Sequence, residues 1–408
     1  MDFGKEAMAM KFSSKVEACG LSPVRKFYPY ELAAEARGVK IHHLNIGQPD
    51  IETPEVFFQV IRSFPDKVVA YAPAPGTPEF LRAARDYYQR LGCELTCEDI
   101  LATYGGSEAL QIVMSCLLDE GDEVLVPEPY YPNYDTFIRI TGATIRPIKT
   151  TEAEGYHYAD RSRIEPLINE RTRAILITNP GNPTGVVLSE EERRTMVDIA
   201  KEHDLFLISD EVYREIVYGG RQVSSMLQYT DADENIVVVD SVSKRFSATG
   251  ARVGALVSRN KQLMVEASKI AQSRLCIASI EQAGAAAMYD QLKPDYYAAV
   301  LAEYQSREQA IVESLSKLPG VTFNSPEGAF YLMASLPVDD AEKLQYFLLE
   351  EFEDEGETVM VTPAEGFYAD PQDGRSKVRI AYVTNPADLR RSVEILGRGI
   401  EAYNRRKA

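Results

Sequence analysis

Short apolar runs alternate with helical patterns through the middle of the chain. Aliphatic and β-branched residues form runs at 99–103, 123–127, 143–148, 174–178, 205–209 and 236–240. Helical patterns lie between them at 109–118 and 189–203, and Ser189 followed by Glu192 is typical of a helix start. This alternation predicts a parallel sheet with right-handed crossovers, whose strands are buried on both faces. We therefore predict an α/β fold for this region.

The pattern changes near residue 290. A helical stretch rich in Ala, Glu, Tyr and Gln runs to Leu318, and Pro319 and Gly320 follow it. Beyond it we expect strands at 321–324, 328–332 and 377–383, and a helix at 342–353. A chain of this length predicts two domains. We expect a large domain over 46–290 and a small α+β domain made from 1–45 and 291–408, with the linker near 285–300.

Composition narrows the classes of function. The 408 residues carry a net charge of −18, which argues against nucleic acid or an anionic membrane surface as a partner. No apolar run approaches about 18 residues, so we expect no membrane span. The N-terminal residues lack the pattern of a signal peptide. The five cysteines (Cys19, Cys93, Cys97, Cys116, Cys276) form no metal-binding pattern. We expect a cytoplasmic protein with free thiols and no metal.

The stretch from Asp240 to Lys244 is the first candidate for chemistry. It ends an apolar strand, contains two serine hydroxyls, and is followed by Gly250, Arg252 and Gly254. Burial at a strand end lowers the pKa of a lysine and favours Schiff-base formation. The hydroxyls, the arginine and glycines that let backbone approach suit a phosphate. Together they suggest pyridoxal phosphate, although most strand-end lysines near an arginine form ordinary surface pairs.

Two other strand ends carry polar side chains that suit the same cofactor. The strand at 174–178 leads into a turn with two Asn-Pro steps, where Asn182 can donate to an oxygen. The strand at 205–209 leads to Asp210 and Tyr213, and a desolvated carboxylate there needs a partner such as a protonated pyridine nitrogen. Each has a simpler explanation, a structural turn for Asn182 and a helix N-cap for Asp210.

Glycines and aromatic residues are further candidates for the cofactor site. Gly106 and Ser107 open a helix after the strand at 99–103, where backbone N–H groups can bind phosphate. In the loop after the next strand, the ring of Tyr130 or Tyr131 can stack on a planar cofactor, although such rings more often belong to a core or an interface. Because the carboxyl ends of parallel strands meet at one edge of the sheet, these signals predict a single site.

These motifs resemble those of the class I/II aminotransferases of the fold type I pyridoxal-phosphate family. The most specific are Asn179-Pro-Gly-Asn-Pro-Thr-Gly185, Ser209-Asp-Glu-Val-Tyr213, and Ser241-Val-Ser-Lys244 with Arg252. The resemblance covers nearly the whole chain. It implies a large domain with a mainly parallel seven-stranded sheet flanked by helices, and a small α+β domain from both termini. It also implies ping-pong transfer of an amino group from an L-amino acid to a 2-oxo acid, with pyridoxal 5′-phosphate as cofactor.

The resemblance implies a role for each motif residue. Lys244 would form the Schiff base and act as general base, and Asp210 would pair with the pyridine N–H. Tyr213 and Asn182 would hold the O3′ of the ring, on which Tyr131 would stack. Contacts with the cofactor phosphate are implied for Gly106, Ser107, Ser241, Ser243 and Arg252.

Substrate and subunit contacts are implied as well. Arg379 would bind the α-carboxylate of the substrate, with Asn182 and the backbone of Gly47. Tyr71 would reach the cofactor phosphate of a neighbouring subunit. The resemblance therefore implies a homodimer with active sites at its interface.

Other functions and the choice of substrate stay open at this point. A carbon–sulfur β-lyase of the same fold would begin with the same proton removal, but would need no 2-oxo acid. A regulatory protein with this fold is expected to lack Lys244 or Arg379, and both are present. Arg274 lies in a segment that resembles one entering the active site of the partner subunit, where it would suit a side-chain carboxylate; the alternative is a surface arginine. Tyr28 and Tyr30 would suit aromatic or apolar substrates.

Overall fold

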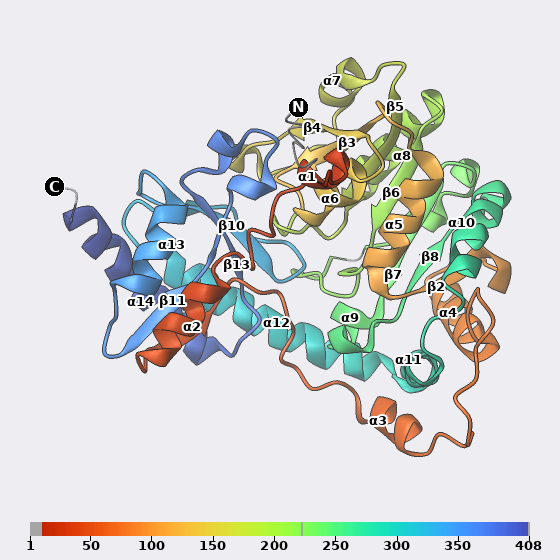
Figure 1. Cartoon of the computed structure of the whole chain (residues 1–408), viewed down its shortest axis with the longest axis horizontal. Coiled ribbons are helices and arrows are strands. Elements are labelled where there is room, and N and C mark those ends of the chain that lie inside the picture. Colours follow the sequence, from red (N-terminus) through yellow and green to blue (C-terminus); the bar gives the residue numbers. More distant parts are fainter. Residues whose placement is uncertain (1–9, 222, 407–408) are drawn as a thin grey trace, which may run out of the picture.

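The computed structural model describes residues 10–221 and 223–406. The expectations that concern residues 1–9, their place in the small domain and the missing signal peptide, lie outside the described residues. The described residues form a seven-stranded sheet in one part of the molecule, and a four-stranded and a two-stranded sheet in the other, with helices packed around them (Figure 1). The strands are β1 Lys40–His43, β2 Ile100–Thr103, β3 Glu123–Glu128, β4 Thr144–Lys149, β5 Thr172–Thr178, β6 Phe206–Asp210, β7 Ile236–Ser241, β8 Gly254–Val257, β9 Thr322–Phe323, β10 Tyr331–Ser335, β11 Glu357–Met360, β12 Thr362–Pro363 and β13 Lys377–Ala381.

The helices alternate with the strands of the first sheet and cluster around the second. They are α1 Ser14–Glu17, α2 Tyr28–Ala36, α3 Glu55–Arg62, α4 Pro78–Arg90, α5 Gly105–Leu117, α6 Asn133–Arg139, α7 Arg161–Ile164, α8 Glu190–Glu202, α9 Val242–Arg245, α10 Lys261–Ser273, α11 Ser279–Gln291, α12 Pro294–Leu315, α13 Ala341–Glu350 and α14 Pro386–Arg405. The expected start at Ser189 is confirmed, because Ser189 and Glu192 form a capping box.

The larger sheet has the order β2-β8-β7-β6-β5-β3-β4. All predicted strands of the middle region belong to it, and its parallel pairings confirm the expected mainly parallel seven-stranded sheet. The exception is β8, which runs antiparallel to both β2 and β7. The apolar runs did not predict β8, because it has only four residues and begins at Gly254, within the glycine-containing segment after Lys244.

Continuous apolar strands are explained by burial on both faces of this sheet. In β5, Ile175 and Ile177 join one core together with residues of α4, α8 and α11. Ala174 and Leu176 point to the other face and join a core with residues of α5, α6 and α10. A strand between two such layers needs no polar face. The polar residues that follow these strands are therefore left at the sheet edge.

The smaller sheet is antiparallel, with the order β12-β13-β10-β9, and packs with α12, α13 and α14 around a core of its own. The strand expected at 328–332 begins later, at Tyr331. Gly328 makes only an isolated bridge to Val217, and Ala329 has a φ of 56°, so the regular ladder cannot start before them. The predicted helix at 342–353 is α13, and the strand at 377–383 is β13.

Residues 28–43 of the N-terminal segment join the C-terminal part, whereas α1 does not, because Lys15 contacts Thr141 and Glu120 beside the large sheet. β1 pairs in parallel with β11, and α2 contacts α13. The helix α12 runs between the two parts in Figure 1. Tyr296 and Tyr297 near its start pack against the core of the large sheet, whereas Ile311 and Leu315 belong to the second core. We propose that the domains are 46–290 and 1–45 with 291–408, because α11 ends at Gln291.

Among the described residues, no helix combines the length and the apolar character that crossing a membrane requires.

Candidate active site

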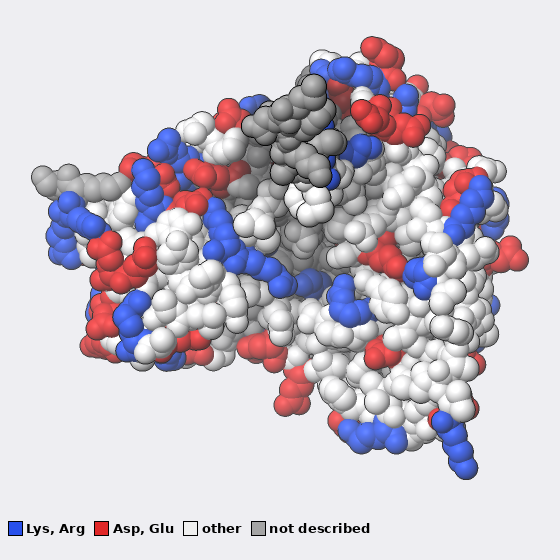
Figure 2. Space-filling view, viewed as in Figure 1, with Lys and Arg blue, Asp and Glu red and all other residues white. Residues whose placement is uncertain are grey.

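A cavity of about 600 Å³ lies at the carboxyl ends of the central strands, where the two parts of the molecule meet. Figure 2 shows the hollow between them, with Lys and Arg side chains along its lower edge. Twelve of the residues singled out in the sequence line it: Gly47, Gly106, Ser107, Tyr131, Asn182, Asp210, Tyr213, Ser241, Ser243, Lys244, Arg252 and Arg379. Signals spread over more than 300 residues therefore converge on one space.

Lys244 enters the cavity from α9, a single helical turn directly after β7. Ser241 caps this turn, since its Oγ accepts from the backbone N–H of Ser243 at 3.1 Å. The partly buried Nζ of Lys244 donates to the carbonyl oxygen of Gly47 at 2.8 Å. A Cβ at Gly47 would lie 1.6 Å from the hydroxyl oxygen of Tyr331, so a side chain there would have to displace Tyr331. The short cap and the glycine together fix where the lysine amine lies.

Asp210 faces the cavity from the end of β6. Its Oδ2 accepts from the Tyr134 hydroxyl at 2.7 Å, and that hydroxyl also meets Oγ1 of Thr178 at 2.5 Å. Burial raises the pKa of the Asp210 carboxyl to about 6, and the Tyr134 hydrogen bond acts in the opposite direction. Such a carboxyl would be stabilised as the anion by a cationic N–H partner in the cavity. Tyr134 was not predicted, although it lies in the aromatic loop from which Tyr131 was chosen.

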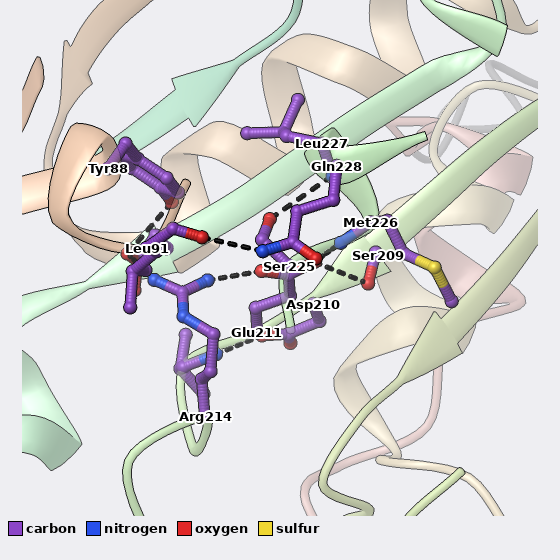
Figure 3. A network of polar contacts seen from close by, with 12 residues as sticks. Tyr88, Leu91, Ser209, Asp210, Glu211, Arg214, Ser225, Met226, Leu227 and Gln228 are labelled. Atoms are coloured by element: carbon purple, nitrogen blue, oxygen red, sulfur yellow. Dashed lines mark hydrogen bonds and ion pairs between the residues drawn. The ribbon is translucent and has the colours of Figure 1, made fainter. Parts of the chain in front are cut away.

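Glu211 points away from the cavity, as strand alternation requires for the neighbour of Asp210. It accepts from the backbone N–H of Met226 at 2.8 Å and forms an ion pair with Arg214 (Figure 3). Arg214 continues to Asp240, 3.1 Å away, which also pairs with Arg245 at 2.9 Å. These buried charges lie behind the ends of β6 and β7. They therefore support the two strands that carry Asp210 and Lys244.

Backbone N–H groups and hydroxyls form a cup at the start of α5. Gly106 and Ser107 lie there, and Ser241 and Ser243 lie opposite, with their Oγ atoms 2.7 Å apart. A helix start of this kind suits a phosphate. The donors therefore fit the phosphate of pyridoxal 5′-phosphate.

Arg252 completes the cup from an unusual backbone position. Its φ is 55°, and its guanidinium donates to the backbone oxygens of Thr249 and Tyr104, at 2.9 and 3.1 Å. A Cβ at Gly105 would lie 2.6 Å from Nη2 of Arg252. A Cβ at Gly254 would lie 2.6 Å from the carbonyl carbon of Gly105, so a glycine is needed here for the two backbone segments to pack.

Gly250 lines the cavity but has open space around it. The close approach of its backbone to a bound phosphate therefore stays a prediction.

Arg379 is a buried cation without an anionic partner among the described residues. It is 3% exposed, and it donates to the Asn45 carbonyl at 2.7 Å and to Oδ1 of Asn182 at 3.2 Å. Its Nε has no hydrogen-bond partner, and Tyr331 covers the guanidinium with its ring 4.6 Å away. A buried guanidinium in this state is suited to a carboxylate that binds through two oxygens.

Tyrosines form the remaining wall. The Tyr213 hydroxyl donates to the Tyr331 hydroxyl at 3.1 Å, and their rings meet edge to face. Tyr131 lines the cavity and meets Tyr134 edge to face, whereas Tyr130, the other stacking candidate, is buried in the core beside α5. Tyr331 was not predicted. Its only sequence signal is its place in the expected strand at 328–332.

Some sequence candidates lie elsewhere. Tyr71 is 80% exposed and does not line the cavity of its own chain. Tyr28 and Tyr30 also lie outside the cavity, and Tyr30 packs on Tyr346 in the small part. From the N-terminal segment, Arg25 with Ser22 and Val24 lines the cavity instead.

Arg274 is half-buried and does not line the cavity of its own chain, so a role in the active site of a partner subunit stays a prediction. Its guanidinium is 3.1 Å from Glu108 and donates to the carbonyls of Ala74 and Ala102, at 3.3 and 2.6 Å. It thereby ties the loop before α4 to β2.

Comparison with known proteins agrees with this arrangement. The family model of aminotransferase class I and II matches residues 39–396. Aspartate aminotransferase of Bacillus subtilis is 29% identical over 97% of this chain and 100% of its own length. Among solved structures, aspartate aminotransferase from Thermus thermophilus with maleate is 28% identical with a TM-score of 0.87. Alanine aminotransferase from Pyrococcus furiosus is 26% identical, also with a TM-score of 0.87. Each of these two structures covers 96% of this chain, and the chain covers all of each.

These relatives favour amino transfer over the β-lyase alternative. The match spans most of the chain and includes every strand of the large sheet. The chain therefore belongs to the class I and II aminotransferases, and it is a pyridoxal-phosphate-dependent enzyme that transfers amino groups from amino acids to 2-oxo acids.

Proposed function

We propose that Lys244, Asp210 and Arg379 are the residues that carry amino transfer in this chain. The observation that carries the proposal is their convergence: an amine, a carboxyl with a pKa raised by burial, and an unpaired buried guanidinium line one cavity. Each group lacks the partner that the cofactor or the substrate would supply. Ionisable groups that converge on one cavity without their charged partners are typical of a binding site.

Bound pyridoxal 5′-phosphate supplies an aldehyde for the amino group and a ring that accepts electrons from the reacting carbon. Lys244 then serves as the general base, moving the proton from the substrate Cα to C4′ of the cofactor. Its hydrogen bond to the Gly47 carbonyl keeps the amine in the cavity when it is not bonded to the cofactor. We propose that the same lysine acts in both stages of a ping-pong reaction.

Asp210 would keep the ring nitrogen protonated, and Tyr134 would hold the carboxylate in place. Tyr213 and Asn182 would hold the phenolic oxygen of the ring, on which Tyr131 would stack. Phosphate contacts are proposed for Gly106, Ser107, Ser241, Ser243 and Arg252. All of these residues line the cavity, except Tyr134, which contacts Asp210 from behind.

Arg379 would bind the α-carboxylate of the substrate, with Asn182 and the backbone of Gly47 beside it. Asn182 already contacts Arg379 at 3.2 Å. We further propose L-aspartate as an amino donor, because relatives from several organisms are named aspartate aminotransferases. Because one of the similar solved structures is an alanine aminotransferase, the experiment below also includes other amino donors.

We also propose a cytoplasmic homodimer. Val68 and Val69 are 72% and 60% exposed, and Tyr71, Tyr104 and Leu275 are exposed as well. Apolar exposure of this kind is typical of a protein interface. A second subunit would bring its Tyr71 to the phosphate cup. All five cysteines are free, which suits a reducing compartment.

A panel of amino donors with 2-oxoglutarate as acceptor tests the proposed function. We expect L-aspartate to convert bound pyridoxal phosphate to its amine form, with the matching change in absorbance. If no amino acid does so, or if pyruvate and ammonia appear without any 2-oxo acid acceptor, the proposed reaction is wrong.

A further inference from the structure

The lining of the cavity is strongly basic in a chain of net charge −18. Four lining residues are cationic, namely Arg25, Lys244, Arg252 and Arg379, and among the described residues Asp210 is the only acidic one. Three of these cations have a role in the proposed function. Arg252 faces the phosphate, Arg379 the α-carboxylate, and Lys244 the reacting carbon. The proposed function assigns no anionic group of the cofactor or the substrate to Arg25.

The segment that carries Arg25 is anchored on both sides. Pro23 is buried and packs on Gly366, where a Cβ would lie 3.1 Å from the Pro23 ring. Phe27 is 1% exposed, and its ring lies 5.0 Å from that of Tyr346. These contacts fix the backbone at the cavity rim. Arg25 is therefore presented from a defined place and not from a free tail.

Lys26, the neighbour of Arg25, is half-buried and does not line the cavity. Lys26 forms an ion pair with Glu342 on α13. No such partner satisfies Arg25, whose exposed guanidinium makes no hydrogen bond or ion pair with any residue in the described ranges. Unused donors at the mouth of a cavity are free to bind a ligand.

Arg25 and Arg379 line the same cavity, and the charges of both act on Tyr131. Burial raises the pKa of Tyr131 to about 12, while the positive charges of Arg379 and Arg25 both act in the opposite direction. The positive charges of both guanidinium groups thus act at the ring that is proposed to stack on the cofactor. A substrate held by Arg379 would extend its side chain into a space that Arg25 borders.

We propose that Arg25 is the specificity-determining residue that binds the side-chain carboxylate of a dicarboxylic substrate; this rests on the proposed function. Arg274, the alternative suggested by the sequence, is occupied by Glu108 and two backbone carbonyls. Arg25 would give a planar guanidinium for a bidentate contact. The choice of substrate would then lie within the same chain, on the N-terminal segment.

The test compares Arg25→Met and Arg25→Lys in the holoenzyme, with Arg390→Met as a matched control. Arg390 is exposed on α14 and does not line the cavity. The first readout is the binding of succinate and of butyrate, which differ by one carboxylate. We expect Arg25→Met to weaken succinate at least about tenfold more than butyrate. We expect Arg25→Lys to restore part of that loss and Arg390→Met to change neither.

The second readout is the ratio of cofactor conversion by L-aspartate to conversion by L-alanine. This ratio should fall at least about tenfold in Arg25→Met. Equal losses for both ligands and both donors, or no loss, would overturn the proposal. If Arg25 instead stacks on apolar or aromatic side chains, L-tyrosine would lose more than L-aspartate, which also overturns it. A wild-type enzyme that converts no donor would refute the proposed function, while the succinate-to-butyrate ratio would still report on Arg25.

Discussion

The Lys244 amine and the Gly47 carbonyl oxygen are 2.8 Å apart, although 197 residues separate them in the sequence. The contact joins the end of β7 to the segment after β1, and therefore joins the two parts of the molecule at the reacting group. Position 47 also favours glycine, for a separate reason. Tyr331 fills the space in which a side chain at position 47 would lie.

Gly47→Ala is expected to lower the rate of amino transfer by about 10²-fold, because its Cβ would displace Tyr331 or the carbonyl that meets Lys244. Steady-state kinetics with L-aspartate and 2-oxoglutarate measure the effect. Gly20→Ala is the matched control, since Gly20 has open space around it. Equal activity of the two variants would show that the crowding at Gly47 has no catalytic consequence.

Asp210 makes the stability of the cofactor-free protein depend on pH. Its pKa is raised from 3.8 to about 6 by burial, so the folded state binds the proton more tightly than the unfolded state. The stability that comes from the neutral carboxyl is complete below about pH 4 and is lost as the pH rises through about 6. The difference amounts to roughly 3 kcal/mol at most.

Asp210→Asn should remove this dependence. Without cofactor, we expect the variant to become more stable than the wild type as the pH rises from about 4 to 7, as measured by urea unfolding. With cofactor, we expect weaker binding and slower proton removal, because the ring nitrogen loses its anionic partner. Parallel pH profiles of the two cofactor-free proteins would contradict the assigned pKa.

Arg379→Met should raise the KM for amino donors by roughly 10² to 10³-fold, since the α-carboxylate loses a buried partner. The affinity for pyridoxal phosphate should change little, because the phosphate cup lies elsewhere. Arg390→Met serves as the control for loss of one positive charge. A loss of cofactor with an unchanged KM would assign Arg379 to the cofactor and not to the substrate.

Arg245→Met should destabilise the protein by about 3 kcal/mol, because Asp240 would keep only one of its two guanidinium partners in a buried site. Urea unfolding measures the change. The exposed Arg390→Met should stay within about 0.5 kcal/mol of the wild type. Similar values for both variants would show that the buried charges contribute no net stability.

Much of the large domain could be predicted from the sequence, because its strands are buried on both faces and form unbroken apolar runs. The polar residues that end these runs had to meet at one edge, which brought Asn182, Asp210 and Lys244 together. β8 was missed because four apolar residues after a glycine-rich turn carry no periodic signal.

Other site residues depend on contacts between distant segments. Tyr331 reaches Tyr213 from the small sheet, and Arg25 reaches the cavity from the N-terminal segment. No local pattern distinguishes such residues from core tyrosines or surface arginines. The buried charges of Arg214 and Arg245 were missed for the opposite reason, since a sequence pattern assigns charged residues to the surface.

The central claim is that Lys244 both holds the cofactor and moves the proton. Absorbance of Lys244→Ala with pyridoxal phosphate, together with its turnover of L-aspartate and 2-oxoglutarate, tests this claim most directly. We expect the variant to fold and to bind the cofactor, to lack the absorbance band of the lysine-linked cofactor, and to lose nearly all turnover. Normal transamination by Lys244→Ala would contradict the account.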